Sequence, residues 1–249
     1  MKIDAYFTPY FPETENQFSD QILIMIDVLR ASTTVCAALF NGAKEIIPCS
    51  DMQSAVAINS KLGKDGRFLG GERGGLKPDG FDAGNSPQDY SREKVEEKTV
   101  IMTTTNGTKT FLKGKEASLR IIAGFVNFNS VLDAINHYVA QTSSSGKDIG
   151  VTFLCAGTGG RLSYEDLCCA GAYINHLINN QVVTQMTDTA DAANNLFKAH
   201  SSDLAGFMKT KTHARHLKEI GFESDLDLCF SFDTFPVVPV MESNKIKIL

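Results

Sequence analysis

The stretch from Gly70 to Pro87 has the residue types that hold a small anionic ligand. It contains six glycines and few apolar side chains that could build a core. Glu72 is a candidate metal ligand, and Arg73 or Lys77 is a candidate to bind a phosphate or acid group of the ligand. Glycine lets backbone amides approach a ligand, and neighbouring acidic and basic groups can hold a metal ion beside an anionic oxygen. The stretch therefore indicates a site for a phosphorylated small molecule. The alternative, a surface turn with solvated charges, is disfavoured by the density of glycines.

A second candidate segment places Asp27 at the end of an apolar run and Arg30 three residues later. A carboxylate in that position can bind a metal ion or act as a nucleophile. Arg30 leads into an expected helix whose first amides attract anions. The alternative is that Asp27 caps this helix and pairs with Arg30 at the surface. A carboxylate inside so apolar a strand needs a compensating partner, which favours the functional role.

A third segment, Thr-Thr-Thr-Asn-Gly-Thr at residues 103–108, follows an apolar run and opens another expected helix. Hydroxyl groups, an amide side chain and helix-start amides can form a phosphate cradle without positive charge. An ordinary helix cap would need only one such residue. The expected phosphate contacts are Thr104, Thr105, Asn106, Gly107 and Thr108.

A fourth loop contains Gly-Thr-Gly-Gly at residues 157–160. It lacks the third glycine of the G-x-G-x-x-G dinucleotide pattern, which disfavours an oxidoreductase that uses a nicotinamide cofactor. Arg161 is a candidate to bind a second acidic group of the substrate. Glu165 and Asp166 begin an expected helix, where an acidic residue can simply be a favourable partner of the helix dipole. Of these two, Asp166 is the preferred metal ligand.

These loops need a scaffold that brings them together, and the rest of the sequence predicts one. From residue 21, short apolar runs alternate with amphipathic stretches, which is typical of parallel strands linked by helices. In such folds ligands bind at the carboxyl ends of the strands, where the strand-to-helix loops gather. We therefore expect a three-layer α/β/α fold with a mostly parallel or mixed sheet, and a site built by those loops.

The expected strands are residues 22–26, 45–49, 67–69, 99–103, 119–123 and 149–155. The expected helices are residues 32–41, 52–62, 107–113, 130–141, 164–179, 190–199 and 212–220. Residues 225–230 and 236–241 either add strands at a sheet edge or return to close the site. We expect a single α/β domain over residues 1–249, in which the serine-rich connector near 143–148 is a candidate boundary between two subdomains.

Composition excludes several classes of protein. The net charge of −5 and the lack of a run of Lys and Arg argue against a nucleic-acid partner. Six cysteines without a C-x-x-C pair predict buried, reduced thiols rather than disulfides or zinc ligands. None of the five histidines stands beside a Ser or Cys in a nucleophile motif, which disfavours a Ser-His-Asp hydrolase. Asp4 interrupts any signal peptide and no apolar run could cross a bilayer, so we expect a cytoplasmic protein without a membrane partner.

Five blocks of the sequence occur together in one order. They are IDVLRASTT at residues 26–34, GGERGG at 70–75, GNSP at 84–87, TTTNGT at 103–108 and CAGT at 155–158. Jointly they resemble the 2-phosphosulfolactate phosphatase family, and the likeness runs from about residue 20 to about residue 235. The sequence DLDLC at residues 225–229 also resembles an acidic closing motif of the family, whereas residues 184–211 match only loosely.

The resemblance implies an Mg²⁺-dependent phosphomonoester hydrolase that converts (2R)-2-phospho-3-sulfolactate and water to 3-sulfolactate and phosphate, a step of coenzyme M biosynthesis. One to three carboxylates from Asp27, Glu72 and Asp166 would then bind Mg²⁺. Arg30 and the metal would hold the phosphate, and Arg73 or Arg161 would bind the sulfonate or carboxylate. Asp27 attacking through a phosphoaspartate and attack by a metal-bound water both remain open.

Two other functions are consistent with the same loops. One is a non-catalytic protein that binds an anionic metabolite, and the other is a phosphatase of the same family acting on another phosphorylated hydroxy acid. Metal-dependent release of phosphate separates the binding protein from either enzyme. An acidic α/β enzyme of this size is often a homo-oligomer, and we expect a dimer.

Overall fold

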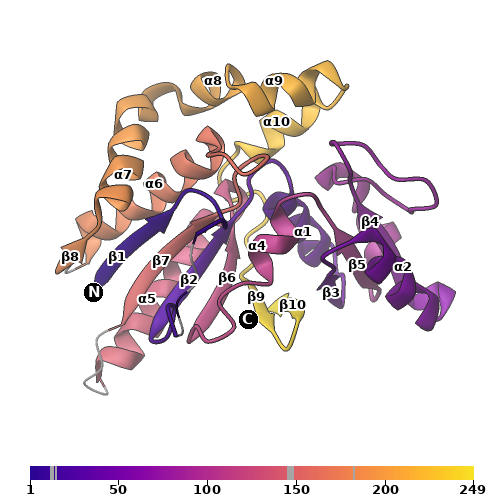
Figure 1. The fold of residues 1–249 in the computed structure, drawn as a ribbon, viewed down its shortest axis with the longest axis horizontal. Helices are drawn as coiled ribbons and strands as arrows, with labels where there is room; N and C mark the ends of the chain where they lie inside the picture. Colours follow the sequence, from indigo (N-terminus) through magenta and orange to yellow (C-terminus); the bar gives the residue numbers. More distant parts are fainter. Residues whose placement is uncertain (12–13, 15, 145–148, 182) are drawn as a thin grey trace.

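Ten strands form one mixed sheet in the computed structural model, which describes residues 1–11, 14, 16–144, 149–181 and 183–249. The strand order is β4-β5-β3-β10-β9-β6-β2-β7-β1-β8. The described strands pair in parallel except where β9 or β10 takes part. Helices pack on both faces of this sheet (Figure 1). The expected three-layer α/β/α fold with a mostly parallel sheet is confirmed.

The strands are β1 (Lys2–Tyr6), β2 (Gln21–Ile26), β3 (Glu45–Pro48), β4 (Arg67–Gly71), β5 (Thr99–Thr103), β6 (Leu119–Ala123), β7 (Gly150–Cys155), β8 (Gln185–Met186), β9 (Pro239–Glu242) and β10 (Lys245–Ile248). The helices are α1 (Ala31–Phe40), α2 (Met52–Lys61), α3 (Arg92–Val95), α4 (Gly107–Phe111), α5 (Phe128–Ser144), α6 (Tyr164–Asn180), α7 (Asp188–His200), α8 (Leu204–Lys209), α9 (Thr212–Glu219) and α10 (Glu223–Cys229). The six strands and seven helices expected from the sequence are all present, and β1, β8, β10, α3 and α8 are additions.

The central strands are apolar throughout because both faces of the sheet are covered. Strands β5 and β7 are buried at every position, and β2 is buried at all but its first residue. Along β2, Ile22 and Ile24 pack into a core with α5 and α6, whereas Leu23 and Met25 pack into a core with α1. This alternation follows from the two-residue period of a strand, which turns successive side chains to opposite faces of the sheet.

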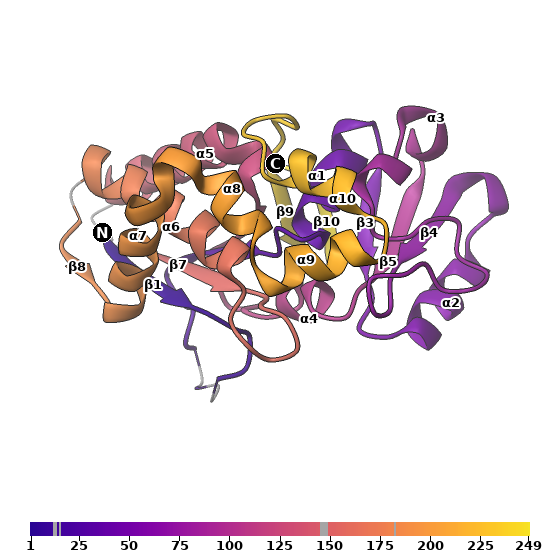
Figure 2. The ribbon, with the colours of Figure 1, turned by 90° about the horizontal axis from the view of Figure 1, so that it is seen from above.

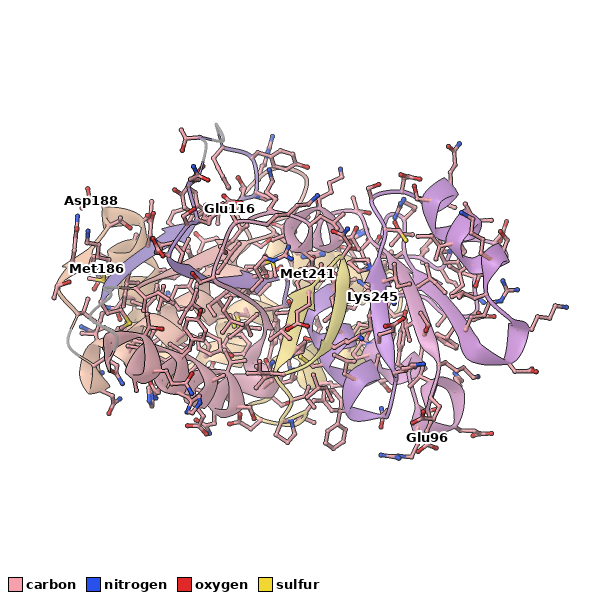
Figure 3. The ribbon with its side chains drawn as sticks, turned by 90° about the horizontal axis from the view of Figure 1, so that it is seen from below. Glu96, Glu116, Met186, Asp188, Met241 and Lys245 are labelled. Atoms are coloured by element: carbon pink, nitrogen blue, oxygen red, sulfur yellow. The ribbon has the colours of Figure 1, made fainter. Side chains whose placement is uncertain are left out.

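A strand at the edge of the sheet is one of the two possibilities that the sequence offers for residues 236–241. Strand β9 lies instead inside the sheet, as part of the C-terminal hairpin β9–β10. Val240 of β9 pairs with Ile121 of β6, and Ile246 of β10 pairs with Ile46 of β3, both antiparallel. Met241 and Lys245 mark this hairpin near the middle of the molecule (Figure 3). The hairpin therefore joins the group β4-β5-β3 to the group β6-β2-β7-β1-β8.

Helices α8, α9 and α10 cross over the carboxyl ends of the parallel strands (Figures 1 and 2). Residues 225–230, for which a strand is expected, belong mainly to α10. Leu226, Cys229 and Phe230 are buried and recur at helical spacing, and Glu223 and Asp225 lie in the first turn, where the helix dipole favours acidic residues. The second expectation for this segment, that it returns to close the site, is confirmed by its contacts below.

Three further expectations can be compared with the fold. All six cysteines are buried and free, as expected. Among the described helices, none combines the length and apolar character needed to cross a membrane. The candidate subdomain boundary near residues 143–148 falls largely on residues 145–148, outside the described residues.

Candidate functional site

A cavity of about 240 Å³ lies at the carboxyl ends of the parallel strands, where residues of α9 also line it. Its walls come from the loops after β2, β4, β5 and β7 and from α9, so it draws on both groups of strands. The lining residues are Asp27, Leu29, Arg30, Glu72, Gly74, Gly75, Asn85, Thr105, Asn106, Thr158, Gly159, His213, His216 and Leu217.

Asp27 follows the last residue of β2 and is almost fully buried. Its Oδ1 accepts a hydrogen bond from the amide of Ala31 at 3.1 Å, and its carbonyl accepts one from the amide of Ser32 at 2.8 Å. The first amides of α1 therefore bind Asp27 itself, and the expectation that they attract a ligand anion is not met for these two. Asp27 does cap the helix, but its pairing with Arg30 at the surface is not observed.

The carboxyl group of Asp27 lies in an environment that opposes its charge. Burial raises the pKa of Asp27 to about 6, although the Ala31 amide and the charge of His213 lower it. A nearby cation would therefore stabilise the ionised form.

Gly107 brings the loop after β5 against Asp27. A Cβ atom on Gly107 would lie 2.6 Å from Asp27 Oδ2 and 2.5 Å from the Cβ of Ala31. Strands β3, β10, β9 and β6 separate β5 from β2 in the sheet, so this connection crosses from one group of strands to the other. Only glycine allows so close an approach, which explains the Asn-Gly pair in this loop.

Glu72 organises two of the predicted loops. Its Oε1 accepts the amide of Thr105 at 2.6 Å, and its Oε2 accepts the amide of Gly75 at 2.9 Å and the hydroxyl of Thr105 at 3.1 Å. Gly71 precedes it with φ +149°, where a Cβ would lie 2.1 Å from the carbonyl oxygen of Thr103. The glycine-rich stretch thus folds back on Glu72 and carries its carboxylate to the cavity wall.

Arg30 connects the loop after β2 with α10 and with the glycine-rich stretch after β4. Its Nη1 lies 2.7 Å from Asp225 Oδ2, its Nη2 donates to the carbonyl of Gly75 at 2.7 Å, and its guanidinium stacks 4.1 Å from the ring centroid of Phe222. Asp225 also accepts from the hydroxyl of Ser86 at 2.7 Å. Arg30 and Asp225 are both buried, so their charges compensate each other away from water.

The threonine loop contributes fewer cavity contacts than expected. Thr105 and Asn106 line the cavity, and Gly107 packs against Asp27. Thr104 and Thr108 instead bond to each other: the amide of each donates to the hydroxyl of the other, at 3.3 and 3.0 Å. These two residues bond within the loop, and neither is among the residues that line the cavity.

Four other candidate residues lie outside the cavity lining. Arg73 donates to the carbonyl of Glu72 at 2.6 Å and to Thr103 Oγ1 at 2.9 Å. Lys77 and Arg161 are exposed. Asp166 lies behind Asp27, where its two carboxylate oxygens accept the amides of Val28 and Gly157.

Asp166 links the ends of β2 and β7 through these two amide contacts, at 2.8 and 3.0 Å. Burial and the charge of Asp27 raise the pKa of Asp166 well above its ordinary value, although both amides lower it. The structure therefore brings Asp27, Arg30, Glu72, Thr105 and Asn106 together and gives Asp166 a supporting position.

His213 and Asn85 are cavity residues that the sequence did not single out. His213 Nδ1 lies 2.7 Å from Oε1 of the buried Glu165 and 3.0 Å from Thr158 Oγ1. The histidine is 48 residues from its carboxylate partner, so no local motif could reveal the pair. Asn85 lies in the GNSP block, which the sequence analysis uses only as one of the blocks that carry the family resemblance.

The oxygen atoms of the cavity suit Mg²⁺. Asp27 and Glu72 supply carboxylates, and Asn85 supplies a buried amide oxygen, Oδ1, that has no hydrogen-bond partner in the described structure. Mg²⁺ prefers oxygen ligands and usually keeps several waters, so one or two carboxylates and a substrate phosphate are enough. Within the described ranges, no group of three or more His, Cys, Asp and Glu side chains has the arrangement of a metal site. The residues thus fit a magnesium site in which water and the substrate phosphate complete the coordination, rather than a site made of protein ligands alone.

Comparison with known proteins gives a consistent result. The family model described as 2-phosphosulpholactate phosphatase matches residues 6–244. The chain is 36% identical over 240 residues to a "Probable 2-phosphosulfolactate phosphatase" of Caldanaerobacter subterraneus subsp. tengcongensis, covering 94% of this chain and 95% of that protein.

Two further relatives carry the same name. A protein of Clostridium beijerinckii is 34% identical over 232 residues, which are 93% of each chain. A protein of Thermotoga petrophila is 37% identical over 218 residues, which are 88% of each chain. The match therefore spans both groups of strands and every loop of the cavity, and the chain belongs to the 2-phosphosulpholactate phosphatase family.

Proposed function

We propose that this protein is an Mg²⁺-dependent phosphatase that hydrolyses (2R)-2-phospho-3-sulfolactate to 3-sulfolactate and phosphate, as in coenzyme M biosynthesis. The observation that carries the proposal is the convergence of Asp27, Glu72 and Arg30 in one cavity at the carboxyl ends of the strands. The names of the relatives support the substrate.

The charges of the cavity support a bound cation. Two buried carboxylates, Asp27 and Glu72, line the cavity, and the positive charge of Arg30 is already paired with Asp225. A phosphate dianion would be repelled by this surplus of negative charge, so a divalent cation is needed beside it. We propose that Asp27, Glu72 and Asn85 hold Mg²⁺. Asp166 would fix the loop that carries Asp27, because it accepts the amide of the next residue, Val28. When bound, the ion neutralises phosphate charge and favours attack at phosphorus.

Arg30 is proposed to orient the phosphate. A guanidinium has five N–H donors, and two contacts, to Asp225 and to the Gly75 carbonyl, leave donors free for phosphate oxygens. Thr105 and Asn106 line the same cavity, where the amide and hydroxyl of Thr105 donate to Glu72. Asp27 is proposed to serve as a metal ligand or as the nucleophile, and both roles require its ionised form.

Phosphate release is the direct test of the proposed function. The panel contains 2-phospho-3-sulfolactate, 2-phospholactate and other phosphorylated hydroxy acids, each with Mg²⁺ and with EDTA. We expect Mg²⁺-dependent release that is fastest for the sulfonate-bearing substrate. Absence of release from every compound, with binding retained, would instead identify a non-catalytic binding protein.

The choice of variants makes this test specific to the cavity. Asp27→Asn is expected to lower kcat by at least ~100-fold, because it removes a charge that the reaction needs. Asp51→Asn is the control, since Asp51 is an exposed cap of α2 outside the cavity. We also propose a homodimer, which size-exclusion chromatography with light scattering tests independently of activity.

A further inference from the structure

His213 is held in a fixed orientation at the wall of the cavity. Its Nδ1 lies 2.7 Å from Glu165 Oε1 and 3.0 Å from Thr158 Oγ1, and Thr158 Oγ1 lies 2.7 Å from Ser163 Oγ. Glu165 is buried and the His213 side chain is 19% exposed. His213 lines the cavity, and its Nδ1 is engaged by Glu165, so we take Nε2 as the ring nitrogen available to a ligand.

The surroundings of His213 favour its protonated form. Burial lowers the pKa of His213 and Arg30 opposes its charge, but the hydrogen bond and charge of Glu165, together with Asp27, raise the pKa above its ordinary 6.5. The titratable and charged groups around it are Glu165 from α6, Asp27 and Arg30 after β2, Glu72 after β4, and His216 from α9 itself. These surroundings favour the imidazolium over the neutral ring.

Hydrolysis of an alkyl phosphate requires such a proton donor. The leaving oxygen of a phosphorylated hydroxy acid departs as a strongly basic alkoxide unless it receives a proton while the P–O bond breaks. A positioned general acid typically accelerates such a step by about 10²–10⁴-fold. In the proposed function Asp27, Glu72 and Arg30 are assigned to the metal and the phosphate. Two histidines, His213 and His216, also line the cavity. Among the described contacts it is His213 whose ring is held by a buried carboxylate, which makes it the better positioned donor.

We propose that His213 is the general acid that protonates the leaving oxygen through Nε2, and that Glu165 is its positioning residue. The P–O ester bond breaks, its electron pair stays on the ester oxygen, and the Nε2 proton completes the alcohol. Over the whole reaction water gives a hydroxyl group to phosphorus, and its second proton restores the imidazolium. This inference rests on the proposed phosphatase function and assigns the acid in that reaction.

Leaving-group dependence tests the role of His213 directly. The probes are 2-phospho-3-sulfolactate, 2-phospholactate and 4-nitrophenyl phosphate, whose aryl leaving group needs no proton. For His213→Gln we expect kcat to fall by about 100-fold or more on both alkyl esters. On the aryl ester we expect the same variant to lose less than about 10-fold, since the acid contributes little there.

Other roles for His213 give different patterns with the same probes. If His213 bound the sulfonate, the loss would appear with 2-phospho-3-sulfolactate only and mainly in KM. If His213 only anchored α9, all three substrates would lose activity equally. Either pattern overturns the proposal.

Glu165→Gln tests whether Glu165 acts on the ring of His213 or contributes only to the packing around it. The amide can still accept from Nδ1 but removes a negative charge, so the pKa of His213 falls. Because the acid must be protonated, we expect the alkaline limb of kcat for alkyl esters to move to lower pH, with activity largely retained on the acidic side. An unmoved limb in a folded Glu165→Gln protein would contradict the role of Glu165.

His216→Gln is the matched control for both variants. His216 lines the same cavity from the same helix, and any loss is expected to be equal for alkyl and aryl esters. Circular dichroism and thermal unfolding confirm that each variant is folded. If the parent enzyme releases phosphate from none of the three probes, the proposed function fails; if it does so and His213→Gln shows no leaving-group dependence, only this inference fails.

Discussion

Among the single residues of the cavity, Asp27 is expected to lower the free energy of unfolding when it is ionised. Asp27 is an ionisable group with little solvent and no direct positive partner in the described structure, and burial raises its pKa to about 6. Such an arrangement suits a group that receives a cation with its ligand. It also makes the free protein sensitive to pH.

The pH dependence of stability follows from this shift. Asp27 ionises near pH 3.8 when unfolded and near pH 6 when folded, so the native state holds the proton more tightly. Its contribution is therefore absent below about pH 4, becomes increasingly destabilising between pH 4 and pH 6, and reaches about 2–3 kcal/mol above pH 6. We expect Asp27→Asn, measured by urea unfolding in EDTA, to be more stable than the parent at pH 8 and equal to it near pH 4.

Asp51→Asn is the control, because its effect on stability at pH 8 is expected to have the opposite sign. Hydrogen bonds from Ser54 and Ser50 lower the pKa of Asp51, so its charge stabilises the fold above its unfolded pKa. This variant is expected to lose stability at pH 8. Equal behaviour of the two variants would contradict the assignment of the Asp27 shift to burial.

Gly107 provides a steric prediction. Its missing Cβ makes room for Asp27 Oδ2, so Gly107→Ala must displace the carboxylate or the loop. We expect a loss of about 1–3 kcal/mol in unfolding free energy and a lower kcat/KM. Gly66→Ala is the control, because a Cβ added to Gly66 would meet nothing within 4 Å. Unchanged kinetics for Gly107→Ala would show that this loop has no fixed position relative to Asp27.

At the scale of elements, α10 is fastened to the site by one buried ion pair. Removing Asp225 leaves Arg30 charged and unpaired beneath the helix, and such a loss typically costs about 3–5 kcal/mol. We expect Asp225→Ala to reduce the unfolding free energy by this amount and to impair activity. Asp227→Ala on the same helix breaks only an exposed pair with Lys209 and should cost less than about 1 kcal/mol. Chemical denaturation compares the two; similar losses would mean that α10 is held by other contacts.

The sequence predicted helices and strands better than it predicted the contacts between residues that lie far apart in the chain. Strand β2 and helix α6 were predictable because their apolar periodicity is local. For residues 225–230 the strand alternative was wrong, since a short apolar run fits either a strand or a helix and these residues belong mainly to α10. Asp27, Arg30 and Glu72 could be found because each stands beside a strand end, whereas His213 depends on a carboxylate that only the folded chain brings near.

At the scale of the whole molecule, the cavity depends on a sheet whose two groups of strands are joined by β9 and β10. Ile246 of β10 is fully buried, whereas Ile248 of the same strand is 51% exposed. We expect Ile246→Ala to cost about 2–5 kcal/mol and Ile248→Ala less than about 1 kcal/mol. Thermal unfolding with phosphate release measures both; a tolerant Ile246 would show that the hairpin does not hold the sheet together.

The position of the hairpin also has a consequence for synthesis. Residues 239–248 follow every other strand in the chain, yet they fill the centre of the sheet. While they are still inside the ribosome, β3 and β6 expose unpaired edges on the emerged polypeptide, and such edges invite association with other chains. We therefore expect the nascent protein to keep these two edges apart until β9 and β10 arrive, and the cavity, whose walls come from both groups of strands, to form after the hairpin has emerged.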